Sequence, residues 1–133
     1  CYHAYMKKLL LVLFLFSISS NVFADWSLVT KSFNGKSYFI DFERITKNNG
    51  YVYFWWMVNY EKPYNKNFLS STTLVQADCK EYRGKSLTWS FYSKPMGKGD
   101  YEKIVPEEPI WTYPNSLSVI DIIFANACRM KNT

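Results

Sequence analysis

The chain has 133 residues and a formal net charge of +5 at pH 7, with 20% aromatic residues and three cysteines. That length suits one domain. The positive excess is too small to predict a nucleic-acid partner, because binding to a phosphate backbone depends on many basic contacts, although it allows weak attraction to anionic surfaces.

The first segment in chain order has the pattern of a secretory signal. Residues 1–5 precede the first methionine, Met6, and we leave them out of the fold. Residues 6–24 then combine two lysines, an apolar run over 9–16 and an exit rich in small residues, which is typical of a cleaved signal peptide. A retained membrane anchor is the alternative, but the apolar run is about half the 20 residues that a spanning helix needs. We therefore predict an exported chain with no transmembrane segment after processing.

The end of this signal indicates where processing is expected. Val22 and Ala24 occupy the two positions that a signal peptidase reads, so we expect the cut before Asp25, which leaves a single domain over 25–133. A lipid anchor would need a cysteine at the cut, where the chain has Asp25. The predicted location is therefore the periplasm or the medium, without a lipid anchor.

The processed chain keeps two of the three cysteines, Cys79 and Cys128. An even pair in an oxidising compartment predicts a disulfide. Closing a loop of this length removes denatured-state freedom worth about 4 kcal/mol in the chain-entropy description. The predicted bridge ties the C-terminus to the body of the fold.

Strand patterns dominate the first two thirds of the domain. The segment over 51–60 is apolar at both parities, as expected of a central strand that is covered on both faces. The turn signals between strands are Asn34-Gly35, Lys47–Gly50, a polar loop over 61–67 and a turn over 81–84. We predict an irregular loop over 93–114, and strands over 26–31, 36–42, 51–60, 68–79 and 85–92.

After Pro114 the apolar period changes to that of a helix. Apolar residues then recur at helical spacing, at Leu117, Ile120, Phe124 and Ala127/Cys128. Ser116 is one candidate N-cap, and a capping box of Ser118 with Asp121 is the alternative. The predicted fold class is α+β, an antiparallel meander sheet of five or six strands with one C-terminal helix packed on it. The edges of such a sheet would also allow copies of the chain to pair as homo-oligomers.

The processed chain offers little that catalysis requires. The only histidine, His3, lies upstream of the signal, which removes Ser-His and Cys-His arrangements and the commonest transition-metal ligand. Asp41 and Glu43 share a strand parity and could serve as a glycosidase pair, but we expect an exposed polar strand face instead. We predict no enzyme, no catalytic residue, no metal and no cofactor.

Aromatic residues are the one compositional excess, and two predicted connections place them beside cations, as protein interfaces favour. The polar loop before the fourth strand carries Lys62, Tyr64 and Lys66. The hairpin turn after that strand carries Tyr82 and Arg83. We predict two separate candidate patches for a protein partner, at opposite ends of that strand. Solvated connectors whose tyrosines lean back onto the sheet are the alternative.

Several local patterns occur together along the domain. They are Tyr38-Phe39-Ile40-Asp41, the pair Trp55-Trp56, Asp78-Cys79-Lys80 at a strand end, the run Phe91-Tyr92-Ser93-Lys94-Pro95-Met96-Gly97-Lys98-Gly99, and Cys128 near the end of the last helix. In this combination the chain resembles the surface-adhesin protein E-like domain family of Gram-negative bacteria, over roughly 25–128. The resemblance implies a sheet-plus-helix domain with a Cys79–Cys128 bridge, and binding of host extracellular-matrix or serum proteins.

The resemblance leaves two functional expectations. The adhesin that names the family is a lipoprotein displayed on the outer membrane, whereas this chain lacks the lipidation cysteine at the expected cut. The first hypothesis is a non-catalytic exported binding module that holds a protein partner in the manner of that adhesin. The alternative is a soluble periplasmic accessory or inhibitor domain that acts on another envelope protein.

Overall fold

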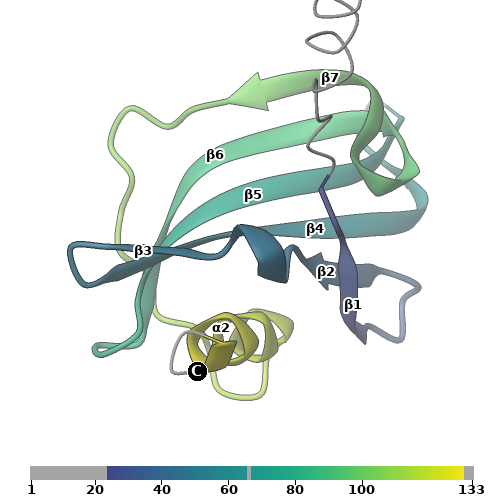
Figure 1. Ribbon diagram of the computed structural model, residues 1–133. Helices are drawn as coiled ribbons and strands as arrows, with labels where there is room; N and C mark the ends of the chain where they lie inside the picture. Colours follow the sequence, from purple (N-terminus) through teal and green to yellow (C-terminus); the bar gives the residue numbers. More distant parts are fainter. Residues whose placement is uncertain (1–23, 66, 131–133) are drawn as a thin grey trace, which may run out of the picture.

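The computed structural model of the chain describes residues 24–65 and 67–130. Residues 1–5 and the predicted signal peptide, apart from Ala24, lie outside the described residues. The described chain forms one antiparallel sheet, two short 3-10 turns and one α-helix (Figure 1). The elements in chain order are β1 (Ser27–Lys31), β2 (Ser37–Ile40), η1 (Phe42–Arg44), β3 (Thr46–Asn48), β4 (Tyr51–Tyr64), β5 (Phe68–Asp78), β6 (Arg83–Lys94), η2 (Pro95–Gly97), β7 (Lys98–Ile104) and α2 (Val119–Met130).

The sheet confirms the predicted antiparallel arrangement. Its strands lie in the order β1-β2-β4-β5-β6-β7, and the short β3 pairs with β4 beside β2. Strand β4 is central, because one edge pairs with β2 and β3 while the other pairs with β5. Phe54 and Met57 lie at opposite parities of β4 and are both buried. The doubly apolar pattern of this strand therefore reflects cover on both faces.

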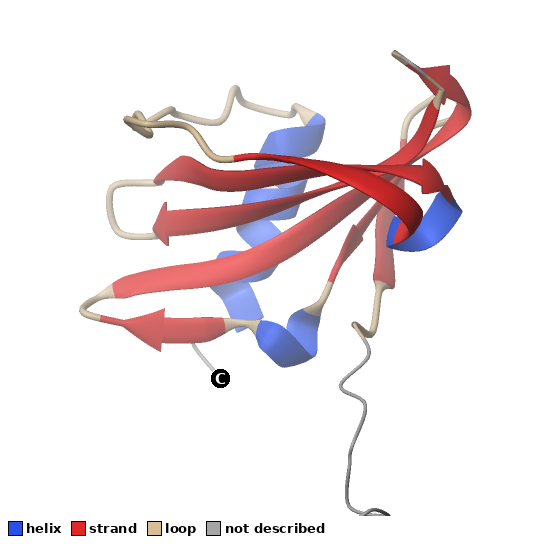
Figure 2. Ribbon diagram, turned by 90° about the horizontal axis from the view of Figure 1, so that it is seen from above, coloured by secondary structure: helices blue, strands red, loops and turns tan. Residues whose placement is uncertain are grey.

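The helix α2 runs across the strands on one face of the sheet (Figure 2) and contacts β1, β2 and β4. Its buried residues are Ile123, Phe124 and Ala127. The predicted apolar stripe was wrong at its N-terminal end, because Leu117 is 91% exposed and Ile120 is 40% exposed. Leu117 has a positive φ of 64° and precedes the helix, so helical spacing does not apply to it.

The helix begins with the capping box that the sequence offered as the alternative. The Ser118 hydroxyl oxygen accepts a hydrogen bond from the Asp121 amide at 3.1 Å. The Asp121 carboxylate in turn accepts one from the Leu117 amide at 2.9 Å. These bonds satisfy amides that have no partner within the helix, so Ser118 rather than Ser116 caps the helix.

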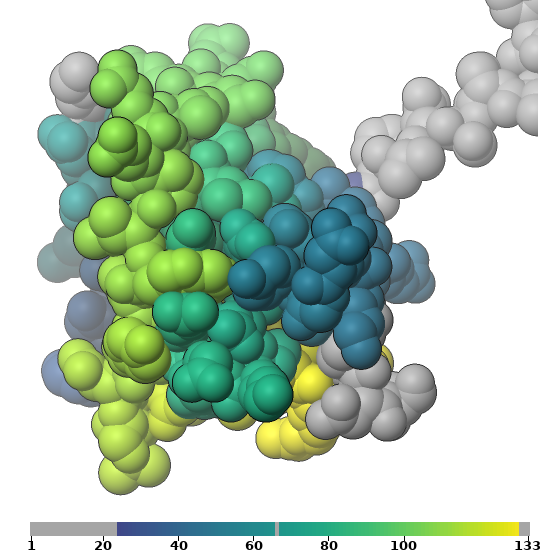
Figure 3. All heavy atoms as spheres, turned by 90° about the vertical axis from the view of Figure 1, so that its left-hand side faces the viewer, coloured from purple at the N-terminus to yellow at the C-terminus, as the bar shows by residue number. Residues whose placement is uncertain are grey.

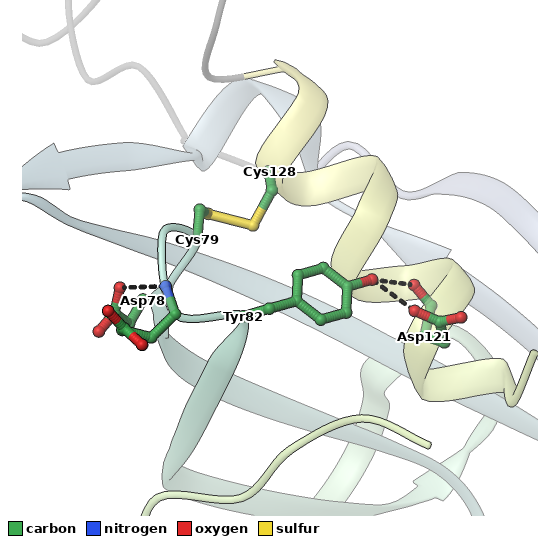
Figure 4. Close-up of a disulfide and its surroundings, with 6 residues drawn as sticks. Asp78, Cys79, Tyr82, Asp121 and Cys128 are labelled. Carbon is green, nitrogen blue, oxygen red and sulfur yellow. Dashed lines mark hydrogen bonds between the residues drawn. A yellow bond between two sulfur atoms is a disulfide. The ribbon is translucent and has the colours of Figure 1, made fainter. Parts of the chain in front are cut away.

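The disulfide Cys79–Cys128 is present as predicted (Figure 4). It joins two residues that are 49 apart in sequence, with their Cα atoms at 5.7 Å. Cys79 follows β5 and Cys128 lies in the last turn of α2. The bridge therefore holds the C-terminal end of the helix against the end of a central strand.

Two predicted connections are strands in the structure. The loop expected over 93–114 contains η2 and then β7, every residue of which is exposed. An edge strand of this kind has no alternating apolar pattern, and its charged residues protect it against pairing with other chains. The loop expected over 61–67 is shorter, because β4 continues through Pro63 to Tyr64 and pairs there with Phe68.

On the face opposite α2, the η2 turn folds back over β4 and β5. The Met96 amide donates to the Asn59 side-chain oxygen at 2.8 Å, and the Gly97 amide donates to the Ser70 hydroxyl at 2.9 Å. Gly97 has a positive φ of 67°, which favours glycine. This turn covers buried Ser70 and reverses the chain into β7.

Candidate functional site

The first predicted patch lies at the tip of the β4–β5 hairpin, at the end of the sheet away from β3. Lys62 and Tyr64 lie on the last residues of β4, and both are exposed. The register of β4 shifts between Asn59 and Tyr64, so these residues leave the regular ladder just before the turn. Lys66 lies outside the described residues.

Aromatic rings pack together at this tip. The Tyr64 ring stacks on Tyr60 with centroids 5.1 Å apart and reaches Phe91 at 6.3 Å. Phe68 lies 5.5 Å from Phe91 and extends the cluster across the hairpin. The predicted alternative, tyrosines that lean back onto the sheet, therefore describes the stacking of Tyr64 with Tyr60 and Phe91, while 48% of the residue stays exposed.

Tyr60 is the anchor of the cluster. It shares the parity of the α2-facing residues of β4 and hydrogen-bonds through its hydroxyl to the Ser71 hydroxyl at 2.8 Å. Burial raises the pKa of Tyr60, and the nearby Tyr64 adds to this effect although the Ser71 bond opposes it. The hydroxyl is therefore neutral at physiological pH and keeps its ring in a fixed position.

The turn between β1 and β2 completes the site. Lys36 places its Nζ atom 5.7 Å from the centre of the Tyr60 ring, a cation–π contact. Gly35 in this turn has a φ of 86°, and a Cβ atom there would lie 1.7 Å from the Glu61 carboxylate. The two turns are thus in contact through the Glu61 side chain, and the positive φ favours glycine at this position.

These elements enclose a hollow of about 390 Å³ that is open to solvent. We call Lys36, Tyr60, Lys62 and Tyr64 the tyrosine–lysine patch. The sequence pointed to Lys62 and Tyr64 but missed Lys36, because only folding brings the first hairpin beside the tip of the second. The lining residues of the hollow are Phe33, Asn34, Lys36, Tyr60, Glu61, Lys62, Pro63 and Tyr64.

The second predicted patch forms contacts within the fold. The Tyr82 ring meets Phe124 edge to face at 5.3 Å, and its hydroxyl donates to the Asp121 carboxylate (Figure 4). Burial and the Asp121 charge raise the pKa of Tyr82 to about 12. Arg83 pairs with Asp78, with 3.2 Å between Nε and Oδ2. The structure thus gives Tyr82 and Arg83 roles in holding the hairpin turn, at the opposite end of β5 from the first patch.

Trp111 is a neighbour of this turn that the sequence did not indicate. The Arg83 guanidinium lies 4.4 Å and the Lys85 ammonium 4.5 Å from the centre of its ring. Its segment is held by two backbone hydrogen bonds of 2.9 Å between Gly84 and Thr112. In Figure 3 this yellow-green segment lies against the teal β5–β6 turn. Both cations are therefore engaged within the chain.

The expected polar face of Asp41 and Glu43 was wrong for one of its two members. Asp41 is buried, with 1% of its surface exposed, and pairs with Arg44 at 2.6 Å. Glu43 is exposed on η1. The chain leaves the strand after Ile40, so the parity that the sequence pattern assumed no longer applies. Within the described ranges, no group of three or more His, Cys, Asp or Glu side chains could hold a metal ion.

The family of the chain follows from comparison with known proteins. A family model described as surface-adhesin protein E matches residues 26–129. The chain belongs to the surface-adhesin protein E family. The chain has no match among curated proteins at the significance required.

Two solved structures of Haemophilus influenzae protein E share the fold of this family member. Crystal form II of that protein has a TM-score of 0.61 at 20% identity, covering 85% of this chain and 94% of that chain. Another structure of it has a TM-score of 0.57 at 21% identity, covering 82% of this chain and 87% of that chain.

Family membership makes the chain an adhesin-like surface binding module and an exported protein. In the part of the chain that the structure describes, no helix is long and apolar enough to span a membrane. The partner-binding surface of this surface-adhesin protein E family member is therefore the feature to be assigned.

Proposed function

We propose that the chain is a non-catalytic exported module that binds a host extracellular-matrix or serum protein through the tyrosine–lysine patch. The observation that carries the proposal is the exposed Tyr64, which stacks with Tyr60 and Phe91 and lines an open hollow together with Lys36 and Lys62. Membership of the surface-adhesin protein E family supports the class of partner.

The physical character of the patch suits protein recognition. Tyr64 presents a rigid ring, because it stacks with both Tyr60 and Phe91, so little side-chain entropy is lost when a partner covers its exposed part. Within the described residues, neither Lys36 nor Lys62 forms an ion pair. The Lys62 charge is therefore available to a carboxylate of a partner, and Lys36, which also contacts the Tyr60 ring, can pair with a second one.

The residues of the patch indicate which kind of partner surface it would bind. The exposed ring would pack against an apolar side chain of the partner, and the lysines would pair with acidic side chains beside it. Complementary charge at the rim mainly raises the rate of association and makes it sensitive to salt. The proposed target is therefore an acidic segment with an exposed apolar residue on a matrix or serum protein.

The direct test uses the purified domain with its disulfide intact. We expect saturable binding to immobilised basement-membrane extract or serum proteins, weakened as salt is raised. A heat-unfolded and reduced sample serves as the control for non-specific adsorption. No saturable binding to either preparation, or equal binding by the unfolded control, would contradict the proposal.

The alternative partner is another envelope protein of the same cell, and location separates the two. Intact cells of the native host are treated with protease, with a known periplasmic protein as the control. Loss of the protein from cells whose control survives supports an adhesin displayed on the surface. Protection together with the control would favour the periplasmic accessory domain and overturn the host-binding proposal.

A further inference from the structure

The backbone of Asp25 lies beside the buried carboxylate of Asp41, and one of the two oxygens of this carboxylate has no hydrogen-bond partner among the described residues. Asp41 follows β2 and is 1% exposed. Its Oδ2 atom accepts from the Arg44 Nε at 2.6 Å and from the Asp25 amide at 3.2 Å. Among the described residues, no donor reaches the Oδ1 atom. A buried charged oxygen without a hydrogen bond is costly, and proteins seldom retain one.

The surroundings hold Asp25 at this carboxylate. The Arg44 guanidinium lies 5.6 Å from the rings of both Trp26 and Trp55, so the segment after Asp25 is clamped against the sheet. The Asp41 amide donates to the Trp55 carbonyl at 3.2 Å, which fixes the other side of the contact. The Asp25 nitrogen is therefore positioned by the fold and does not meet Asp41 by chance.

The same nitrogen is the atom that signal processing would release. The Val22-x-Ala24 motif places the expected cut between Ala24 and Asp25. Hydrolysis by a signal peptidase adds one water across that amide bond. It leaves a carboxylate on Ala24 and an amine on Asp25, and the amine takes up a proton at neutral pH.

We propose that the new α-ammonium of Asp25 forms an ion pair with the buried carboxylate of Asp41, so that processing completes the hydrogen bonding of this carboxylate. The amide of the unprocessed chain offers one N–H donor, whereas an ammonium offers three and a full positive charge. The additional donors supply the partner that Oδ1 lacks. The processed domain is therefore more stable than the precursor. A cut displaced by one residue would move the ammonium away from Asp41 and lose this gain.

The test compares two forms of the oxidised domain, released from a cleavable fusion to begin at Asp25 or at Ala24. Both carry a terminal ammonium, but the longer form displaces it by one residue. We expect the folding equilibrium constant to be about tenfold larger for the form that begins at Asp25, since a buried charged acceptor gains a partner. The same comparison in an Asp41→Asn background should show no difference. Equal stability of the two forms, or a difference that survives in Asp41→Asn, would overturn the proposal.

A second measurement applies even if Asp41→Asn fails to fold. The α-amine is labelled with a limiting amount of an amine-reactive ester at neutral pH, and the N-terminal peptide is quantified by mass spectrometry. We expect labelling of the Asp25 form to be at least several-fold slower than that of the Ala24 form, and equally fast after unfolding. Equal rates in the folded proteins would contradict the ion pair. N-terminal sequencing of protein exported by the native host must also give Asp25, and any other start contradicts the proposed processing.

Discussion

At the scale of single residues, Tyr82 connects the β5–β6 turn to the first turn of α2. Its ring packs against Phe124 and its hydroxyl donates to Asp121. The residue adopts a positive φ of 56°, which is uncommon for a side chain of this size. The contacts with the helix offset the cost of that backbone conformation.

Replacing Tyr82 with phenylalanine separates these two contacts. The ring contact with Phe124 is retained, while the Asp121 carboxylate loses a donor. We expect Tyr82→Phe to lower the free energy of unfolding by about 1–2 kcal/mol, measured by urea denaturation of the oxidised protein. Tyr101→Phe on the exposed edge strand is the control and should change little. Equal stability of Tyr82→Phe and the parent would contradict the role of this bond.

The same bond predicts a dependence of stability on acid. Hydrogen bonds from Tyr82 and from the Leu117 amide hold the pKa of Asp121 below its ordinary value of 3.8. A depressed carboxyl pKa contributes stability above the unfolded value, and this is lost as pH falls from about 4 through the folded pKa. We expect unfolding midpoints to drop more steeply below pH 4 in the parent than in Asp121→Asn. Parallel acid profiles for the two proteins would contradict this assignment.

At the scale of elements, the fit between β6 and α2 depends on one glycine. A Cβ atom at Gly84 would lie 2.7 Å from the Phe124 ring and 3.2 Å from Val75. Gly84 also exchanges both backbone hydrogen bonds with Thr112. Strand, helix and the long C-terminal connection therefore meet at a position that has no space for a side chain.

Gly84→Ala should force the helix away from the sheet. We expect a loss of about 1–3 kcal/mol in the free energy of unfolding, measured by denaturant titration. In a Phe124→Leu background, which frees space beside the glycine, the same change should cost less. An equal cost in both backgrounds would show that the close approach to Phe124 is not the cause.

Elements with a clear apolar pattern could be predicted from the sequence. Elements that depend on contacts between distant segments, or that are exposed at a sheet edge, could not. The central strand over 51–60 and the Cys79–Cys128 bridge followed from apolar residues at both parities and from an even cysteine count. Strand β7 was missed because an exposed edge strand carries no apolar alternation. Half of the tyrosine–lysine patch was predicted from Lys62 and Tyr64. Tyr60 belongs to the same hairpin, whereas Lys36 reaches the patch through a contact between two turns that no local pattern encodes.

At the scale of the whole molecule, the contacts that hold the helix and the patch where we propose that a partner binds lie at different ends of the sheet. The disulfide, Tyr82 and Gly84 gather at the end where β5 meets the helix. The tyrosine–lysine patch lies at the opposite end, on the β4–β5 hairpin and the β1–β2 turn. The β7 edge is exposed and carries charged residues, which disfavour pairing with another chain. The pairing of copies at a sheet edge stays a prediction. Substitutions at the tyrosine–lysine patch should therefore leave the contacts around the disulfide intact.

The central claim is tested most directly by the half-saturating concentration on immobilised matrix extract or serum proteins. The variant Lys62→Ala/Tyr64→Ala is compared with Lys103→Ala/Tyr101→Ala, which removes the same residue types from the exposed β7 edge. We predict that the patch variant raises the half-saturating concentration by about 30-fold or more. The control should change it by less than about threefold, and both variants should remain folded by circular dichroism. Equal effects of the two variants, or no effect of either, would contradict binding through the tyrosine–lysine patch.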